Sequence, residues 1–151
     1  MGCDIHTFVE KRNKETNQWE FVKDDVFSLD DYDKEYFKKE KSSEIFGWRN
    51  YRMFSILNNV RNNCGIIPMY DTDRGFPDDI SKEVKMEYDS YNDHSESYLT
   101  AKELTDFDYD KKATENESYR DCLGDFFFKH LEELKSLGDP DEIRVVFWFD
   151  N

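Results

Sequence analysis

The last residues of the chain, IRVVFWFDN at 143–151, restrict the fold more than any other segment. Side chains of an extended strand alternate between two faces. One face would carry Ile143, Val145, Phe147 and Phe149, and the other Arg144, Val146, Trp148 and Asp150. A strand that is apolar on both faces needs neighbours at its edges and cover on both sides. We therefore expect it to lie inside a sheet and to pair with the strand pattern at residues 3–10.

Helical spacing marks two longer segments. Residues 49–62 place apolar side chains such as Phe54 on one broad arc, and Arg61 falls inside that arc. Residues 118–137 show the same spacing, with Gly138 as the expected C-cap. Both patterns predict amphipathic helices that pack on the sheet.

A shorter helix start is also clear. Thr100 is the expected N-cap, and Glu103 completes a capping box with it. Together these patterns predict an α+β fold, in which a small, largely antiparallel sheet formed from the chain ends is covered by two or three helices. The length of 151 residues suits a single domain, 1–151, and the charged segment 24–44 is expected to be an exposed acidic insertion.

The formal net charge of −14 limits the partners of the chain. Residues 70–125 hold 17 acidic and 7 basic side chains, a net charge of −10. Direct binding to duplex nucleic acid is disfavoured because such binding requires basic surface that releases counterions. The acidic surface is either simply solvated, or it imitates a phosphate backbone and docks on a basic host protein.

Cysteine usage and hydropathy point to a compartment. Cys3, Cys64 and Cys122 are odd in number and widely spaced, which gives no disulfide framework and no zinc pattern. No apolar run is long enough to span a membrane, and no signal peptide is recognised. We expect a cytoplasmic protein without a membrane partner.

Polar residues on the two terminal strands are the first candidates for chemistry. Asp4 and His6 share one strand face, a spacing that can chelate a divalent metal or orient a general acid or base. Asp150 reaches the same neighbourhood if the terminal strands pair. A polar hairpin surface and a solvated chain end are the alternatives. His94 completes the predicted catalytic set.

Arginines and hydroxyls are the candidates for ligand binding. A guanidinium near apolar surface needs an anion, which is either an internal carboxylate or a bound phosphate. His94 lies in the segment DHSES, ahead of the capped helix, where backbone N–H groups can form an anion pocket. The predicted ligand-binding residues are Arg49, Arg52, Arg61, Arg74, Ser95 and Ser97.

No P-loop, GxGxxG, GxSxG, HExxH or zinc-finger motif is present. The segments MGCDIH, RNYRMF…VRN at 49–62, RGFPDDIS at 74–81, HSESYLTAKEL at 94–104 and RVVFWFDN occur in this order. In these segments the chain resembles a family of small uncharacterised proteins encoded mainly by bacteriophages and prophages. The resemblance implies a phage accessory protein of the host cytoplasm, of the kind that often counters host defences. It implies no particular activity.

Two functions follow as hypotheses, beside the plainer option of a structural or packaging accessory. In the first, a His/Asp/Arg pocket binds a phosphorylated, nucleotide-like small molecule; if the protein is an enzyme, it is a hydrolase of phosphate esters. In the second, the protein is an acidic inhibitor that mimics nucleic acid. The identity of the ligand and of any metal stays open.

Overall fold

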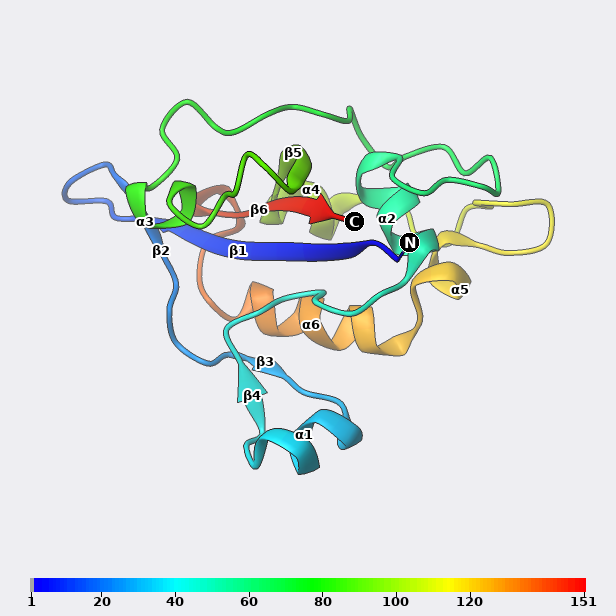
Figure 1. Ribbon diagram of the computed structural model, residues 1–151, viewed down its shortest axis with the longest axis horizontal. Helices are drawn as coiled ribbons and strands as arrows, with labels where there is room; N and C mark the ends of the chain where they lie inside the picture. The colour runs from blue at the N-terminus through cyan, green and yellow to red at the C-terminus, as the bar shows by residue number, and fades with distance from the viewer. Residues whose placement is uncertain (1) are drawn as a thin grey trace.

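The computed structural model describes residues 2–151. Its centre is a four-stranded antiparallel sheet with the strand order β2-β1-β6-β5 (Figure 1). The strands are β1 (Asp4–Arg12), β2 (Trp19–Phe21), β5 (Asp93–Thr100) and β6 (Ile143–Asp150). The predicted sheet built from the chain ends is confirmed, and the two ends of the chain lie side by side.

The last strand, β6, is the central strand of this sheet. Every residue from Ile143 to Phe149 is buried. β1 pairs with β6 over eight residues, from Asp4 opposite Asp150 to Lys11 opposite Ile143. The other edge of β6 is occupied by β5, which the sequence did not predict as a strand.

Helices cover one face of the sheet and enclose the main core. They are α2 (Tyr51–Asn58), α4 (Ala101–Asp106), α5 (Tyr119–Leu123) and α6 (Asp125–Lys135). A 3-10 turn, η1 (Pro140–Glu142), leads from α6 into β6. The predicted helix at 49–62 ends early because Asn59 adopts a left-handed conformation (φ 58°) and caps it. Arg61 therefore lies beyond the helix, and its predicted place on the helical arc is wrong.

The predicted helix at 118–137 is two helices. Gly124 has φ 80° and separates α5 from α6. α6 ends at Lys135, so Gly138 lies beyond the helix rather than capping it. The capping box at Thr100 is confirmed. The Thr100 side chain accepts from the Glu103 N–H, and the Glu103 carboxylate accepts from the Thr100 N–H.

The opposite face of the sheet is covered by residues 71–92, which we call the strap. It contains α3 (Lys82–Lys85) and buries Val84 against Trp148 and Val146. The strap runs across the face of the sheet opposite α6 (Figure 1). It explains why the central strand is apolar on both faces: each face has its own cover.

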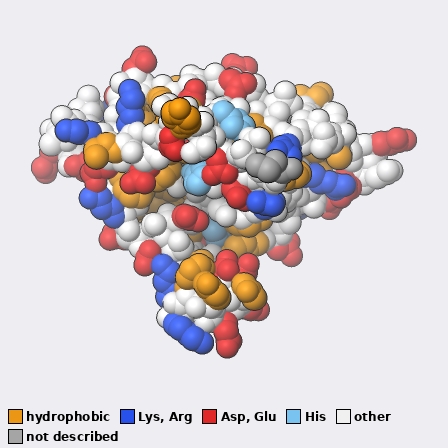
Figure 2. All heavy atoms as spheres, in the orientation of Figure 1, with side chains coloured by type: hydrophobic (Ala, Val, Ile, Leu, Met, Phe, Trp, Pro, Cys, Tyr) orange, Lys and Arg blue, Asp and Glu red, His pale blue; other side chains and the backbone are white. Residues whose placement is uncertain are grey.

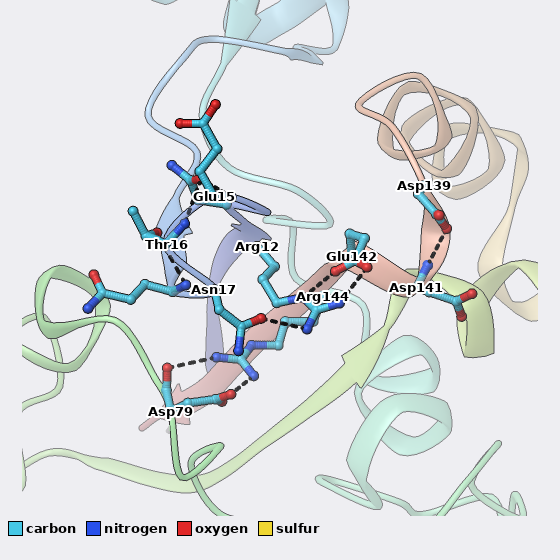
Figure 3. Close-up of polar contacts among 11 residues, drawn as sticks. Arg12, Glu15, Thr16, Asn17, Asp79, Asp139, Asp141, Glu142 and Arg144 are labelled. Atoms are coloured by element: carbon cyan, nitrogen blue, oxygen red, sulfur yellow. Dashed lines mark hydrogen bonds and ion pairs between the residues drawn. The ribbon is translucent and has the colours of Figure 1, made fainter.

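An ion cluster with a buried centre, the Arg144 clasp, fixes the strap to the sheet, and Figure 3 shows its contact between Arg144 and Asp79. We define it as Glu10, Asp79, Ser81 and Arg144. The Arg144 guanidinium donates to Glu10 Oε1 and to Asp79 Oδ1, both at 2.7 Å. Glu10 Oε2 accepts from the Ser81 N–H at 2.7 Å, and Arg144 also stacks over the Trp19 ring. Glu10 is fully buried, so the clasp neutralises a carboxylate inside the protein.

The charged segment 24–44 forms a lobe beneath α6 (Figure 1). It holds β3 (Phe27–Ser28), α1 (Asp31–Phe37) and β4 (Lys41–Ser42). The α1 helix buries no residue, as expected for an exposed segment, and its aromatic side chains lie at the surface of the lobe (Figure 2). β3 differs from that expectation, because both of its residues are buried.

His130 connects this lobe to the core. Its Nδ1 accepts from the Phe46 N–H at 3.0 Å and its Nε2 donates to the Ser28 carbonyl at 2.8 Å. Both nitrogens of a neutral ring are thus satisfied, so this histidine has a structural role. Burial is the main reason that its pKa lies below the usual value.

This lowered pKa predicts a pH-dependent stability. As the pH drops below about 6.5, His130 is protonated in the unfolded chain while it stays neutral in the folded protein. The free energy of unfolding should therefore fall in this range. His130→Gln, which keeps a donor and an acceptor, should flatten this part of the curve. Urea denaturation between pH 5.5 and 7.5 measures it; an unchanged pH slope in the variant would contradict the assignment.

Candidate metal centre

Three side chains from three neighbouring strands converge at the end of the sheet. His6 of β1, Asp93 of β5 and Asp150 of β6 each offer one ligand atom, and these atoms all lie within 4.8 Å of one another. The strand register explains the convergence, because Asp93 lies directly opposite Asp150 and His6 lies opposite Trp148, two positions along. All three are partly buried. We call this group the triad.

Within the triad, His6 and Asp150 are in direct contact. His6 Nε2 lies 2.5 Å from Asp150 Oδ2. The two side chains are 41% and 34% exposed, so neither is sealed from solvent. Figure 2 shows histidine side chains next to acidic ones near the centre of this face, close to where Figure 1 marks the two chain ends.

Asp93 is held in place by a tight turn at the end of the strap. Its Oδ2 accepts from the Asp89 N–H at 2.8 Å, which leaves Oδ1 for another partner. The Tyr88 hydroxyl donates its one proton to Glu96 Oε2 at 2.6 Å and also lies 3.0 Å from the Asp93 carbonyl oxygen. Burial and the hydrogen bond to Glu96 raise the pKa of Tyr88 to about 12, so its hydroxyl stays a donor. Such outer contacts orient a metal ligand before the metal binds.

Asp4 lies next to the triad without belonging to it. It is the register partner of Asp150, but its carboxylate accepts from Arg49 Nε at 3.0 Å and lies 2.9 Å from Arg49 Nη2. The expected chelate of Asp4 with His6 is therefore replaced by His6 with Asp150 and Asp93. Arg49 is thereby brought to the edge of the site.

His94 and Ser95 lie in β5, so the predicted anion pocket at a helix N-terminus is wrong at this position. A β-bulge interrupts the pairing of β5 between His94 and Ser97. His94 Nδ1 lies 2.9 Å from Ser95 Oγ, and Nε2 bonds Asn151. His94 thus lies at the same end of the sheet as the triad.

Three further predicted ligand-binding residues, Arg52, Arg74 and Ser97, have internal partners outside the triad. The Arg74 guanidinium forms a two-pronged ion pair with Glu103 at 2.8 and 2.9 Å. The backbone N–H of Arg74 donates to the buried Ser97 hydroxyl. Burial acts to raise the pKa of Glu103, but hydrogen bonds from Arg74 and Thr100 outweigh it and lower that pKa. Arg52 pairs with Glu117. The structure therefore uses Arg52, Arg74 and Ser97 to hold its own elements together.

The donor set of the triad fits a divalent metal ion. An imidazole nitrogen and two carboxylate oxygens suit Mn²⁺, Fe²⁺ or Zn²⁺. Three protein ligands leave coordination positions for water or substrate, as in catalytic rather than structural metal sites. The same donors also serve as acid and base groups in the absence of a metal.

Among residues 2–151, no helix has the length and apolar character needed to cross a membrane. Comparison with protein-family models, curated proteins and solved structures finds no match to this chain. The resemblance to a phage-encoded family therefore stays a prediction.

Proposed function

We propose that this protein is a metal-dependent hydrolase whose divalent ion is held by His6, Asp93 and Asp150. The observation that supports the proposal is the approach of one imidazole and two carboxylates, from three adjacent strands, to within 4.8 Å. Such an ion supplies a nucleophile by lowering the pKa of a bound water to about 7. The residues around the triad orient its ligands and leave a route for the substrate.

The protein arranges its own groups for this role. The Asp89 N–H and Tyr88 fix Asp93 through its carboxylate and carbonyl, so the ligand needs little reorganisation when a metal binds. Arg49 forms an ion pair with Asp4 and balances its negative charge, so Asp4 does not add a third carboxylate to the ligand set. The partial exposure of His6 and Asp150 leaves a route for substrate.

The alternative, an inhibitor with a nucleic-acid-like acidic surface, receives less support. Several carboxylates that it would use form ion pairs within the chain: Asp79 with Arg144, Asp106 with Lys102 and Asp110 with Arg120. Neutralising Asp79 would disturb the Arg144 clasp as well as the surface. The metal proposal is favoured because a specific geometry supports it.

Thermal melting with and without metal tests the proposal. Saturating Mn²⁺ or Zn²⁺, at about 100 times the dissociation constant, should stabilise the wild type by about 2.7 kcal/mol. For a domain of this size that corresponds to a rise of about 5–10 °C in melting temperature. Asp93→Asn should lose most of this rise because one anionic ligand is gone.

Asp4→Asn is the matched control, because it removes the carboxylate that lies opposite Asp150 in the strand pairing but does not belong to the triad. It should retain the metal-induced rise. An equal rise in Asp93→Asn and wild type, or no rise with any divalent ion, would contradict the proposal.

A further inference from the structure

Arg61 differs from every other arginine of the chain. The structure, which describes residues 2–151, pairs the other six with carboxylates: Arg12 with Glu142, Arg49 with Asp4, Arg52 with Glu117, Arg74 with Glu103, Arg120 with Asp110, and Arg144 with Glu10 and Asp79. Arg61 has no carboxylate partner among those residues, although the chain has 35 acidic side chains for 21 basic ones. In so acidic a protein, an arginine left without a carboxylate is informative.

The backbone and an aromatic ring hold Arg61 in place. It has φ 53°, a left-handed conformation that non-glycine residues adopt at a cost. Its guanidinium lies over the Tyr51 ring, 5.5 Å from the ring centre. The Tyr51 hydroxyl in turn accepts from the Cys3 N–H at 3.0 Å. Arg61 is thus fixed beside the start of β1.

This position lies at the end of the sheet that holds the triad. Cys3 is fully buried, and burial is the main cause of the raised pKa of its thiol. Of the charges near that thiol, Arg61 lowers the pKa and Asp150 raises it. Cys3 directly precedes Asp4, which lies opposite Asp150, so the Arg61 guanidinium over Tyr51 and the triad share one end of the sheet.

We infer that Arg61 binds the phosphate group of the substrate and that the substrates are phosphorylated small molecules. The inference rests on the proposed metal centre. Two carboxylates at this end of the sheet are already engaged, Asp4 by Arg49 and Asp150 by His6. A guanidinium stacked on a ring keeps its N–H groups along the edge, and these match two phosphate oxygens.

The reaction that follows is hydrolysis of a phosphate ester. The oxygen of a water at the metal forms a bond to phosphorus while the ester P–O bond breaks. The proton of that water passes to the leaving alcohol, so no further reactant is needed. Arg61 would hold the phosphate oxygens and offset the charge that they carry.

Calorimetric titration with inorganic phosphate tests the inference, on metal-free and Mn²⁺-loaded protein. Arg61→Lys should weaken phosphate binding by about tenfold or more, because an ammonium cannot reproduce the two-pronged contact. Mn²⁺ binding should be unchanged. Arg52→Lys is the matched control, because Arg52 belongs to the neighbouring helix but pairs with Glu117; it should bind phosphate as the wild type does.

The outcomes separate the two proposals. Loss of phosphate binding in Arg61→Lys, in a protein that binds no Mn²⁺, would support Arg61 and overturn the metal centre. Equal phosphate affinity in wild type and Arg61→Lys, or no phosphate binding by the wild type, would overturn the role of Arg61. Folding should not obscure the result, since the substitution strands no carboxylate; Arg61→Gln provides a second, neutral variant.

Discussion

Arg144→Met should lower the free energy of unfolding by about 3–5 kcal/mol, the cost of stranding a buried charge. Arg144 is the only cation of the Arg144 clasp, and Glu10 is fully buried. Without the guanidinium, Glu10 would keep the Ser81 N–H as its remaining bond in the clasp. The strap would also lose its attachment through Asp79. Urea denaturation monitored by tryptophan fluorescence measures the change.

Two further variants separate this effect from the general loss of an ion pair. Arg12→Met breaks the neighbouring pair with Glu142, which Figure 3 shows beside the clasp, but Arg12 is 35% exposed and water screens it. It should cost far less stability. The double variant Glu10→Met with Arg144→Met should recover part of the loss, because no buried charge is left. A single Arg144→Met variant as stable as the wild type would refute the clasp.

Asp150→Asn should reduce metal-dependent hydrolysis on the order of 100-fold or more, because it removes a charged ligand from the ion that activates water. The folded state should tolerate the change, since Asp150 is partly exposed and an amide can still contact His6. Hydrolysis of p-nitrophenyl phosphate with Mn²⁺ present provides the measurement. Asp4→Asn should keep most of the activity. Undiminished activity in Asp150→Asn, or activity that survives a chelator, would contradict the mechanism.

Alternation along a strand was the most reliable source of prediction. The apolar content of both faces of residues 143–149 required a central strand, and β6 is central. The same reasoning placed Asp150 near His6, which the 2.5 Å contact confirms. Local capping chemistry was equally informative, because the Thr100 box depends only on residues within one turn.

The missed features depend on long-range contacts and on backbone conformations that local patterns do not specify. Asp93 was not predicted as a ligand because the β-bulge after His94, with Ser95 at φ 59°, interrupts the alternation of β5. The break at Gly124 was overlooked because apolar spacing continues across it. The lack of a carboxylate partner for Arg61 could not be predicted, because the ion pairs of the other arginines join residues that are far apart in the sequence.

Titration of the wild type with Mn²⁺ at 0.15 M salt, followed by calorimetry or electron paramagnetic resonance, tests the metal centre most directly. Salt at this concentration screens weak attraction of the ion to the surface of a chain whose net charge is −14. We predict one saturable site per chain that is lost in Asp150→Asn and kept in Asp4→Asn. Binding that is weak, does not saturate and is equal in all three proteins would show that His6, Asp93 and Asp150 do not form a metal centre.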